Sequence, residues 1–238
     1  GDVITTGIQN VAVGMNSLGA LTDADYNVAV GAYALDADTK GSQTTAIGYG
    51  ALSAQNFSTA TNSLNTAVGY LSGLSITTGI RNTLIGAEAG DAITDADNNV
   101  AVGTDALGTN QLGSQNIAIG RLALGTMNPA TALNTYNTAV GADAGFAVTT
   151  GTLNTLLGGL TGDAFTTGTT NTALGAQALS ADTAGNRSVA VGNAALFAQN
   201  FSTSTNSYNV AVGYEAGVAV TTGIYNILIG GLAGDALT

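Results

Sequence analysis

A five-residue motif recurs thirteen times along this 238-residue chain. It reads NVAVG at residues 10–14, and every copy begins with Asn, Thr or Ser and ends with Gly. The final Gly residues are 17 residues apart, as from Gly14 to Gly31. The third spacing, from Gly48 to Gly69, and every fourth spacing after it are 21 residues long. Such a period is typical of solenoid proteins, in which each turn buries its apolar side chains only against neighbouring turns.

The turns are grouped into a longer repeat. Three 17-residue spacings and one 21-residue spacing form a 72-residue super-repeat, of which the chain holds about 3.3 copies. The residue four positions after the motif Gly is either Leu or Gly. From Leu35 onward, two successive turns have Leu at this position and the next two have Gly. The central motif residue is Ala except at Leu84, Leu156 and Leu228, which are each separated by one super-repeat. We therefore treat residues 1–238 as one repeat domain, and we expect a fragment of a longer fibre because both ends fall within a repeat.

Positions two to four of the motif predict a short β-strand. Val, Thr and Ile at these positions favour strands, and the Gly and Asn of every turn disfavour a helix. Successive side chains point to opposite faces, so both faces of this strand are apolar or nearly so. A second strand is expected further along the turn, as in GFAVTT from Gly145 and GVAVTT from Gly217.

The fold class predicted from these features is an all-β parallel β-solenoid of about 13 turns. At about 4.8 Å per turn, this stack would make a rod of about 60 Å. Stacking also places equivalent residues in columns. The column of motif Gly residues has no exception, which predicts a corner with positive φ or a close backbone approach.

Two further columns carry polar side chains. The first motif position is Asn in 11 of 13 turns, and these residues are expected to hydrogen-bond the local backbone at a turn. A second column contains Thr at positions that include Thr22 and Thr149, and it is interrupted at Ala60, Gln111 and Ala132. A regular Thr array is one way to build an ice-binding face. The interruptions favour the alternative, in which each hydroxyl caps the backbone.

Composition excludes several kinds of partner. The formal net charge is −11 with only four cationic side chains, so we expect neither nucleic-acid binding nor attraction to an anionic membrane. No apolar run approaches the roughly 18 residues of a membrane-spanning helix, and no membrane insertion is expected. The chain has no His and no Cys, which rules out Ser-His and Cys-His nucleophiles within it.

Candidate chemistry is sparse. Glu88 and Glu215 are the only Glu residues, and the glycines near Gly158 lack the GK[ST] of a phosphate loop. Three acidic pairs have oxygen ligands suited to Ca²⁺, although none has the spacing of an EF-hand or RTX repeat, and solvated turns are favoured. These pairs are Asp23/Asp25, Asp36/Asp38 and Asp95/Asp97. We predict no enzyme activity, no cofactor and no metal site.

The 21-residue turns are the predicted contact surface, because they interrupt the pattern once per super-repeat. Two of them, AQNFSTATNSLN ending at Asn65 and AQNFSTSTNSYN ending at Asn209, agree at 10 of 12 positions. Their aromatic side chains are the candidate contact residues. These are Phe57, Tyr136, Phe201 and Tyr208.

The motif resembles a known repeat. NVAVG, NTAVG and NIAIG, followed by a small residue such as Ala34, Ala106 or Ala144, look like the head repeat of trimeric autotransporter adhesins, the YadA-like head. Similar repeats occur in phage tail fibres. The resemblance covers nearly the whole chain and implies a left-handed parallel β-roll in which three chains pack side by side. The Ala column would then line the interior, and the Val/Ile column of Val13 and Val30 would face the partner chains.

These features together predict a structural and adhesive rod segment. It would belong to a surface adhesin or viral tail fibre, act outside the cell or on a virion, form a homotrimer, and bind a host-cell surface, matrix protein or glycan. A single-chain β-solenoid with an internal core is the structural alternative. Two functional alternatives stay open: a carbohydrate-active depolymerase fibre, which would need clustered carboxylates, and an ice-binding β-solenoid.

Overall fold

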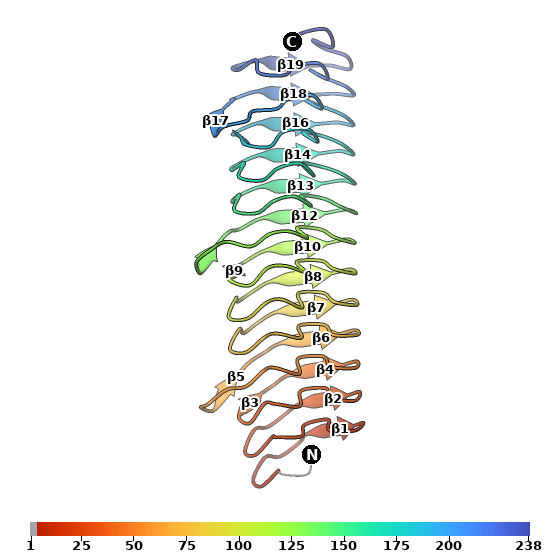
Figure 1. The fold of residues 1–238 in the computed structure, drawn as a ribbon. Coiled ribbons are helices and arrows are strands. Elements are labelled where there is room, and N and C mark those ends of the chain that lie inside the picture. Colours follow the sequence, from red (N-terminus) through yellow and green to blue (C-terminus); the bar gives the residue numbers. More distant parts are fainter. Residues whose placement is uncertain (1–3) are drawn as a thin grey trace. The chain divides into compact units, whose positions relative to one another are not determined.

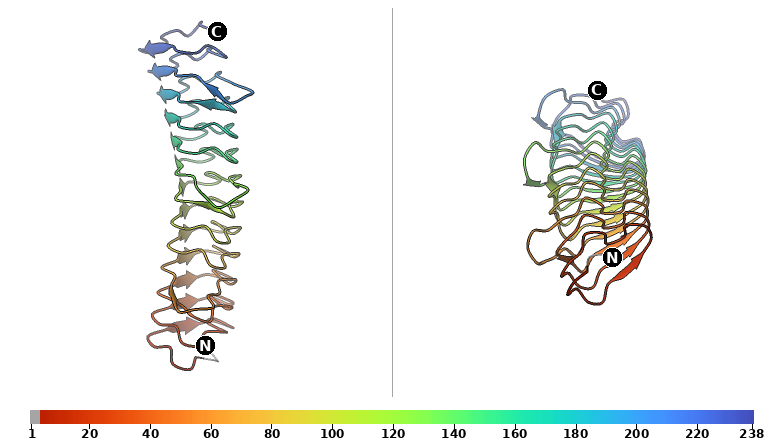
Figure 2. Two further views of the ribbon diagram at one scale, coloured as in Figure 1. Left: turned by 90° about the vertical axis from the view of Figure 1, so that its left-hand side faces the viewer. Right: turned by 60° about the horizontal axis from the view of Figure 1, so that its bottom comes forward.

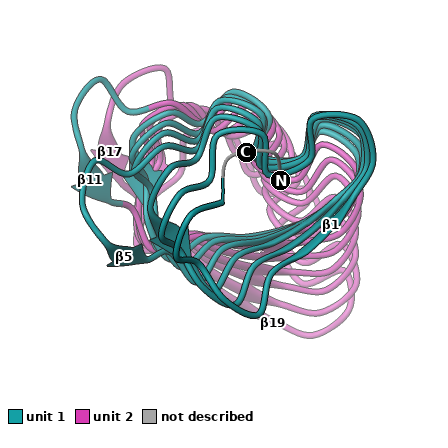
Figure 3. Ribbon diagram, turned by 90° about the horizontal axis from the view of Figure 1, so that it is seen from below, with its two compact units in different colours: residues 1–115, 129–134 teal, residues 116–128, 135–238 magenta. Residues whose placement is uncertain are grey.

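A computed structural model describes residues 4–238, so the first three letters of the opening segment GDVITTGI lie outside the described residues. The chain divides into two compact units, which Figure 3 shows in different colours. Unit 1 comprises the chain up to Gln115 together with Pro129–Asn134, and unit 2 comprises Asn116–Asn128 and Thr135–Thr238. The motif repeats throughout both units.

Each turn contributes one three-residue strand, formed by the central residues of the motif (Figure 1). In unit 1 these strands are β1 (Val11–Val13), β2 (Val28–Val30), β4 (Thr45–Ile47), β6 (Thr66–Val68), β7 (Thr83–Ile85) and β8 (Val100–Val102). In unit 2 they are β10 (Ile117–Ile119), β12 (Thr138–Val140), β13 (Thr155–Leu157), β14 (Thr172–Leu174), β16 (Val189–Val191), β18 (Val210–Val212) and β19 (Ile227–Ile229).

Neighbouring strands within each unit pair in parallel and in register. Ala29 of β2 lies opposite Ala46 of β4, and the register is kept across a long turn, where Ala46 lies opposite Ala67. Residues 4–238 contain no helix. The predicted parallel β-solenoid of about 13 turns is therefore confirmed.

The 21-residue turns leave the stack and return to it through small side sheets. β3 (Gly41–Ser42) pairs with β5 (Thr61–Asn62), β9 (Gly113–Ser114) with β11 (Leu133–Asn134), and β15 (Gly185–Asn186) with β17 (Thr205–Asn206). Figure 2 shows these long turns projecting beyond the shorter turns. The extra residues are thus accommodated outside the core, and the motif strands stay in register.

The second strand predicted for each turn is not formed. Residues 145–150 and 217–222 adopt turns and bends. The second and fourth residues after the motif Gly have left-handed backbone conformations, as at Glu88 (φ 57°) and Leu52 (φ 51°). In the two segments the amide of Val148 donates to the carbonyl oxygen of Gly145, and the amide of Val220 donates to that of Gly217 (both 3.0 Å). These hydrogen bonds close a turn where a strand would need extended backbone at successive residues.

The motif Gly forms the corner that the sequence predicts. Gly48 has φ 137°, and a Cβ built on it would lie 2.1 Å from the carbonyl oxygen of Gly69 in the next turn. Both the backbone conformation and the close approach of neighbouring turns therefore demand Gly at this corner.

Alternating side-chain sizes fill the core. The central Ala of most strands is fully buried, and in β7 the larger Leu84 is fully buried instead. A Cβ built on Gly73 or on Gly90 would lie 2.8 Å from a methyl carbon of Leu84. The two sequence patterns therefore have one physical cause. Gly occurs four residues after the motif Gly in the turns where a Leu at the motif centre needs the space.

The Asn column forms a buried hydrogen-bonded ladder. The Asn82 side chain donates to the carbonyl oxygen of Ala96 (2.8 Å), and its Oδ1 accepts from the backbone amide of Asn99 (3.0 Å). The backbone amide of Asn82 in turn donates to Oδ1 of Asn65 (2.9 Å). Each Asn therefore connects its own turn to the turns on both sides. The sequence predicts only a hydrogen bond to the local backbone.

Candidate functional site

The outward face of the motif strands carries Val, Ile or Leu at the third residue of every strand and Val, Ile or Thr at the first, and it is partly open to solvent. The first and third residues of each strand point away from the core, and within unit 1 Ile47 and Ile85 are 38% and 40% exposed. In unit 2 the corresponding strand positions carry exposed Ile117 and Leu157. Regularly placed apolar residues on a flat face are typical of a surface that another protein covers.

The four aromatic residues predicted to form a contact surface divide into two pairs. Phe57 and Phe201 are only 5% and 6% exposed, and the Phe57 ring packs close to the backbone of Gly41. Both rings are therefore almost fully buried. Tyr136 and Tyr208 are exposed, so contact through these two side chains stays a prediction.

Tyr208 belongs to a cluster that the sequence reasoning did not assemble. Its ring stacks on Tyr225, with centroids 5.3 Å apart and planes at 11°. The guanidinium of Arg187 lies over the Tyr208 ring at 5.4 Å and also donates to its hydroxyl. All three residues precede the first motif position in successive turns, and this shared column is the signal that could have revealed the cluster.

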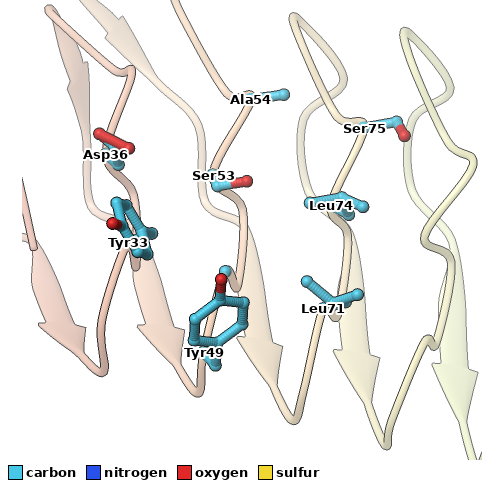
Figure 4. Close-up of a pocket in the computed structure, with 9 residues that line it drawn as sticks. Tyr33, Asp36, Tyr49, Ser53, Ala54, Leu71, Leu74 and Ser75 are labelled. Atoms are coloured by element: carbon cyan, nitrogen blue, oxygen red, sulfur yellow. The ribbon is translucent and has the colours of Figure 1, made fainter. Parts of the chain in front are cut away.

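A second aromatic feature, in unit 1, was missed at the sequence level. We call it the tyrosine groove; it is lined chiefly by Tyr33, Tyr49, Asp36, Ser53, Ser75 and Leu71 (Figure 4). The rings of Tyr33 and Tyr49 meet edge to face, with centroids 5.8 Å apart and planes at 75°. The groove lies beyond the motif Gly corner, on a part of each turn that follows the strand.

The Thr column caps backbone carbonyl groups. The hydroxyl of Thr22 donates to the carbonyl oxygen of Thr39 (3.0 Å), and that of Thr149 donates to Thr166 (3.1 Å). This geometry matches the backbone-capping interpretation favoured by the interruptions in the column.

The acidic pairs serve mainly as acceptors for the backbone and for hydroxyl groups. Asp97 accepts from the amide of Ile80 (2.8 Å), and Asp95 accepts from the hydroxyls of Thr77 and Thr78 (2.9 and 3.0 Å). Asp36 and Asp38 are separated, because Asp38 is fully buried while Asp36 lines the tyrosine groove. Among residues 4–238, no group of three or more acidic, His or Cys side chains is arranged to hold a metal ion.

The two Glu residues lie in different units. Glu88, in unit 1, stands near Asp91, and burial together with the Glu88 charge raises the pKa of the Asp91 carboxyl. Glu215, in unit 2, accepts from Tyr214; this hydrogen bond and the Glu215 charge raise the pKa of the phenol. The structure thus gives each Glu a local electrostatic neighbour within its own unit.

No protein-family model, curated protein or solved structure matches this chain. The likeness to the YadA-like head therefore consists of the motif and of the parallel β-solenoid. Within the described part of the chain, no helix has both the length and the apolar character needed to cross a lipid bilayer.

Proposed function

We propose that this chain is a structural and adhesive segment of an extracellular fibre, either a bacterial surface adhesin of the trimeric autotransporter type or a viral tail fibre. In this proposal the solenoid is a left-handed β-roll, and three copies associate side by side. The fibre binds a host-cell or matrix surface and performs no catalysis.

The observation that carries the proposal is the outward apolar face of the motif strands. Its third-position residues are Val, Ile or Leu in every turn, and Ile47, Ile85 and Ile119 are each more than a third exposed. Removing such a face from water is favourable in proportion to its apolar area. A second and third copy of the same chain offer a surface with the same spacing between turns, so their side chains can interdigitate along the column.

The long turns support the adhesive part of the proposal. They project from the stack, recur once per super-repeat and expose Tyr136 and Tyr208. Tyr side chains combine a large apolar ring with a polar hydroxyl, and they are enriched in protein interfaces.

Sedimentation analysis tests the assembly. At micromolar concentration the protein should sediment with three times its 23.2 kDa chain mass. A monomer at that concentration would overturn the trimer.

Attachment of protein-coated beads to cultured host cells tests adhesion. Beads that carry Tyr136→Ala or Tyr208→Ala are compared with beads that carry Tyr26→Ala, which is the control at another exposed tyrosine. Equal attachment by all variants would remove these two residues from the contact surface.

A further inference from the structure

The tyrosine groove spans three neighbouring turns of unit 1, between residues 33 and 75. At about 4.8 Å per turn, its length is about 10 Å. Tyr49 is 49% exposed, and Tyr33 and Tyr49 form two walls at a steep angle. Tyr70, on the next turn, packs nearly parallel to Tyr49 with its centroid 5.7 Å away, which supports the Tyr49 ring from outside the groove lining.

Three polar side chains line the groove and have no protein partner. Asp36, Ser53 and Ser75 are half-buried, and none of their side chains hydrogen-bonds to any residue between 4 and 238. One of them stands on each of three successive turns. Together they offer two hydroxyl groups, which both donate and accept, and a carboxylate, which accepts.

The groove is a departure from the repeat. Two super-repeats later, Gln177, Ser180 and Asn193 replace Tyr33, Asp36 and Tyr49, and Phe197 replaces Ser53. The equivalent positions one super-repeat later hold Asp105, Gly108, Arg121 and Gly125. The adjoining long turns nevertheless agree at 10 of 12 positions between the first super-repeat and the third. The combination of residues that lines the groove therefore occurs in the first super-repeat and not at the equivalent positions of the other two, although the neighbouring long turn is retained in the third.

We infer that the tyrosine groove binds a neutral glycan, with an apolar C–H face of a sugar ring packed on the tyrosine rings and its hydroxyls bonded to Asp36, Ser53 and Ser75. Aromatic rings have an electron-rich face, which attracts the weakly positive hydrogens of such a sugar face. The polar groups then fix the orientation of the ring, as the few polar groups of a binding pocket do. This inference rests on the proposed adhesive function and names the chemical class of its ligand.

Charge and hydrogen bonding select among ligands. None of the four cationic side chains lines the groove, and Asp36 together with the net charge of −11 disfavours sialylated or sulfated glycans. A quaternary ammonium group could also lie against tyrosine rings beside a carboxylate. It offers no hydrogen-bond donor, however, and would leave both serine hydroxyls unmatched, whereas a sugar uses the whole groove.

The strand face and the groove use different residues. The outward strand residues Thr45, Ile47, Thr66 and Val68 do not line the groove. Glycan binding can therefore be measured on the assembled protein and separately from the oligomeric state.

The test begins with a printed array of neutral, sialylated and sulfated oligosaccharides, followed by calorimetric titration with the neutral oligosaccharide that gives the strongest signal. We expect binding to neutral oligosaccharides, weakened about tenfold by Tyr49→Ala and retained by Tyr49→Phe. Tyr214→Ala is the matched control, because Tyr214 occupies the position equivalent to Tyr70 in the later super-repeat, and it should bind as the unchanged protein does. Circular dichroism and sedimentation verify that each variant is folded and assembled.

Three results would overturn the inference: no binding to neutral oligosaccharides, a preference for sialylated or sulfated ones or for choline, or equal binding by Tyr49→Ala and Tyr214→Ala. A trimer that attaches to cells but binds no neutral oligosaccharide would leave the proposed function standing. Glycan binding by a monomer that attaches to no cell would support the groove and contradict the proposed function.

Discussion

The side-chain amide of Gln199 donates a hydrogen bond of 2.6 Å to the carboxylate of Asp182 in the interior of unit 2. Gln199 also donates to Ser188 (2.8 Å) and accepts from Asn209 (2.8 Å), while Asp182 accepts from the amide of Gly185 (2.9 Å). Both side chains are fully buried. The same arrangement occurs two super-repeats earlier in unit 1, where Gln55 donates to Asp38 at 2.6 Å.

This buried carboxyl should make stability depend on pH. Burial raises the pKa of Asp182 above its usual value of 3.8, even though four hydrogen bonds act in the opposite direction. The folded state therefore binds this proton more tightly than the unfolded state. Its contribution to the free energy of unfolding is greatest below pH 3.8 and is lost as pH rises through the folded-state pKa.

Urea denaturation of the unchanged protein and of Asp182→Asn between pH 4 and 7 tests this. Because Asn binds no proton here, the stability of the parent relative to the variant should fall as pH rises from 4 to 7. Asp23→Asn, at an exposed acid, is the control for the removal of one negative charge. A constant difference between the Asp182→Asn variant and the parent at every pH would refute the prediction.

The core around Leu84 predicts a rescue between two substitutions. Leu84→Ala should lower the free energy of unfolding by about 2–5 kcal/mol, because it leaves a cavity among fully buried side chains. Gly73→Leu alone should cost about 1–3 kcal/mol by overpacking, since its Cβ would lie 2.8 Å from Leu84. The double variant should lose less than the sum of the two, and a double-mutant cycle measures the difference. Strict additivity would contradict the packing arrangement.

The Asn ladder predicts a cost that depends on position. Asn82→Ala removes the side chain that bonds the carbonyl oxygen of Ala96 and the amide of Asn99. Each buried orphan group costs about 1–3 kcal/mol, so we expect a clear fall in the urea midpoint. Asn62→Ala is the control, because Asn62 is exposed on β5 and its side chain makes no hydrogen bond within the described residues. Similar midpoints for both variants would show that the ladder adds no stability.

The outward strand face predicts a change in assembly. Ile85→Glu should dissociate the proposed trimer, because it places a charge in an apolar surface that association would bury. Ser58→Glu adds the same charge to an exposed position in a long turn and should leave the sedimentation coefficient unchanged. Circular dichroism of Ile85→Glu should retain the strand signal. If both variants sediment as the parent does, the strand face is not the interface.

The regular features of the fold were predictable because they repeat. An invariant Gly column such as that of Gly48 has one simple physical explanation, and the alternation of strand residues shows which face contains Ala29. The absent second strand was not predictable from apolar content. The segment following Gly145 is rich in strand-forming residues, but it forms a turn closed by a hydrogen bond from the amide of Val148 to the carbonyl oxygen of Gly145 (3.0 Å). Residue preference contains little information about such a turn when apolar residues occupy it.

The candidate sites were harder to predict for a related reason. The long turns interrupt the pattern visibly, but their length does not reveal that the Phe57 side chain is buried. Tyr33 is the second residue after its motif Gly and Tyr49 is the first after the next one, so they occupy adjacent columns and do not form a visible series. Their proximity depends on the conformation of the corner, which the sequence pattern leaves open.

The packing of Leu84 against Gly73 and Gly90 also limits how a chain of this kind can change its length. Removing one 17-residue turn, residues 65–81, would place Leu52 where Gly73 lies and bring two large side chains into the same space. Removing or adding one whole super-repeat would preserve every such pairing. Duplication during evolution, and deliberate shortening in the laboratory, should therefore proceed in blocks of four turns.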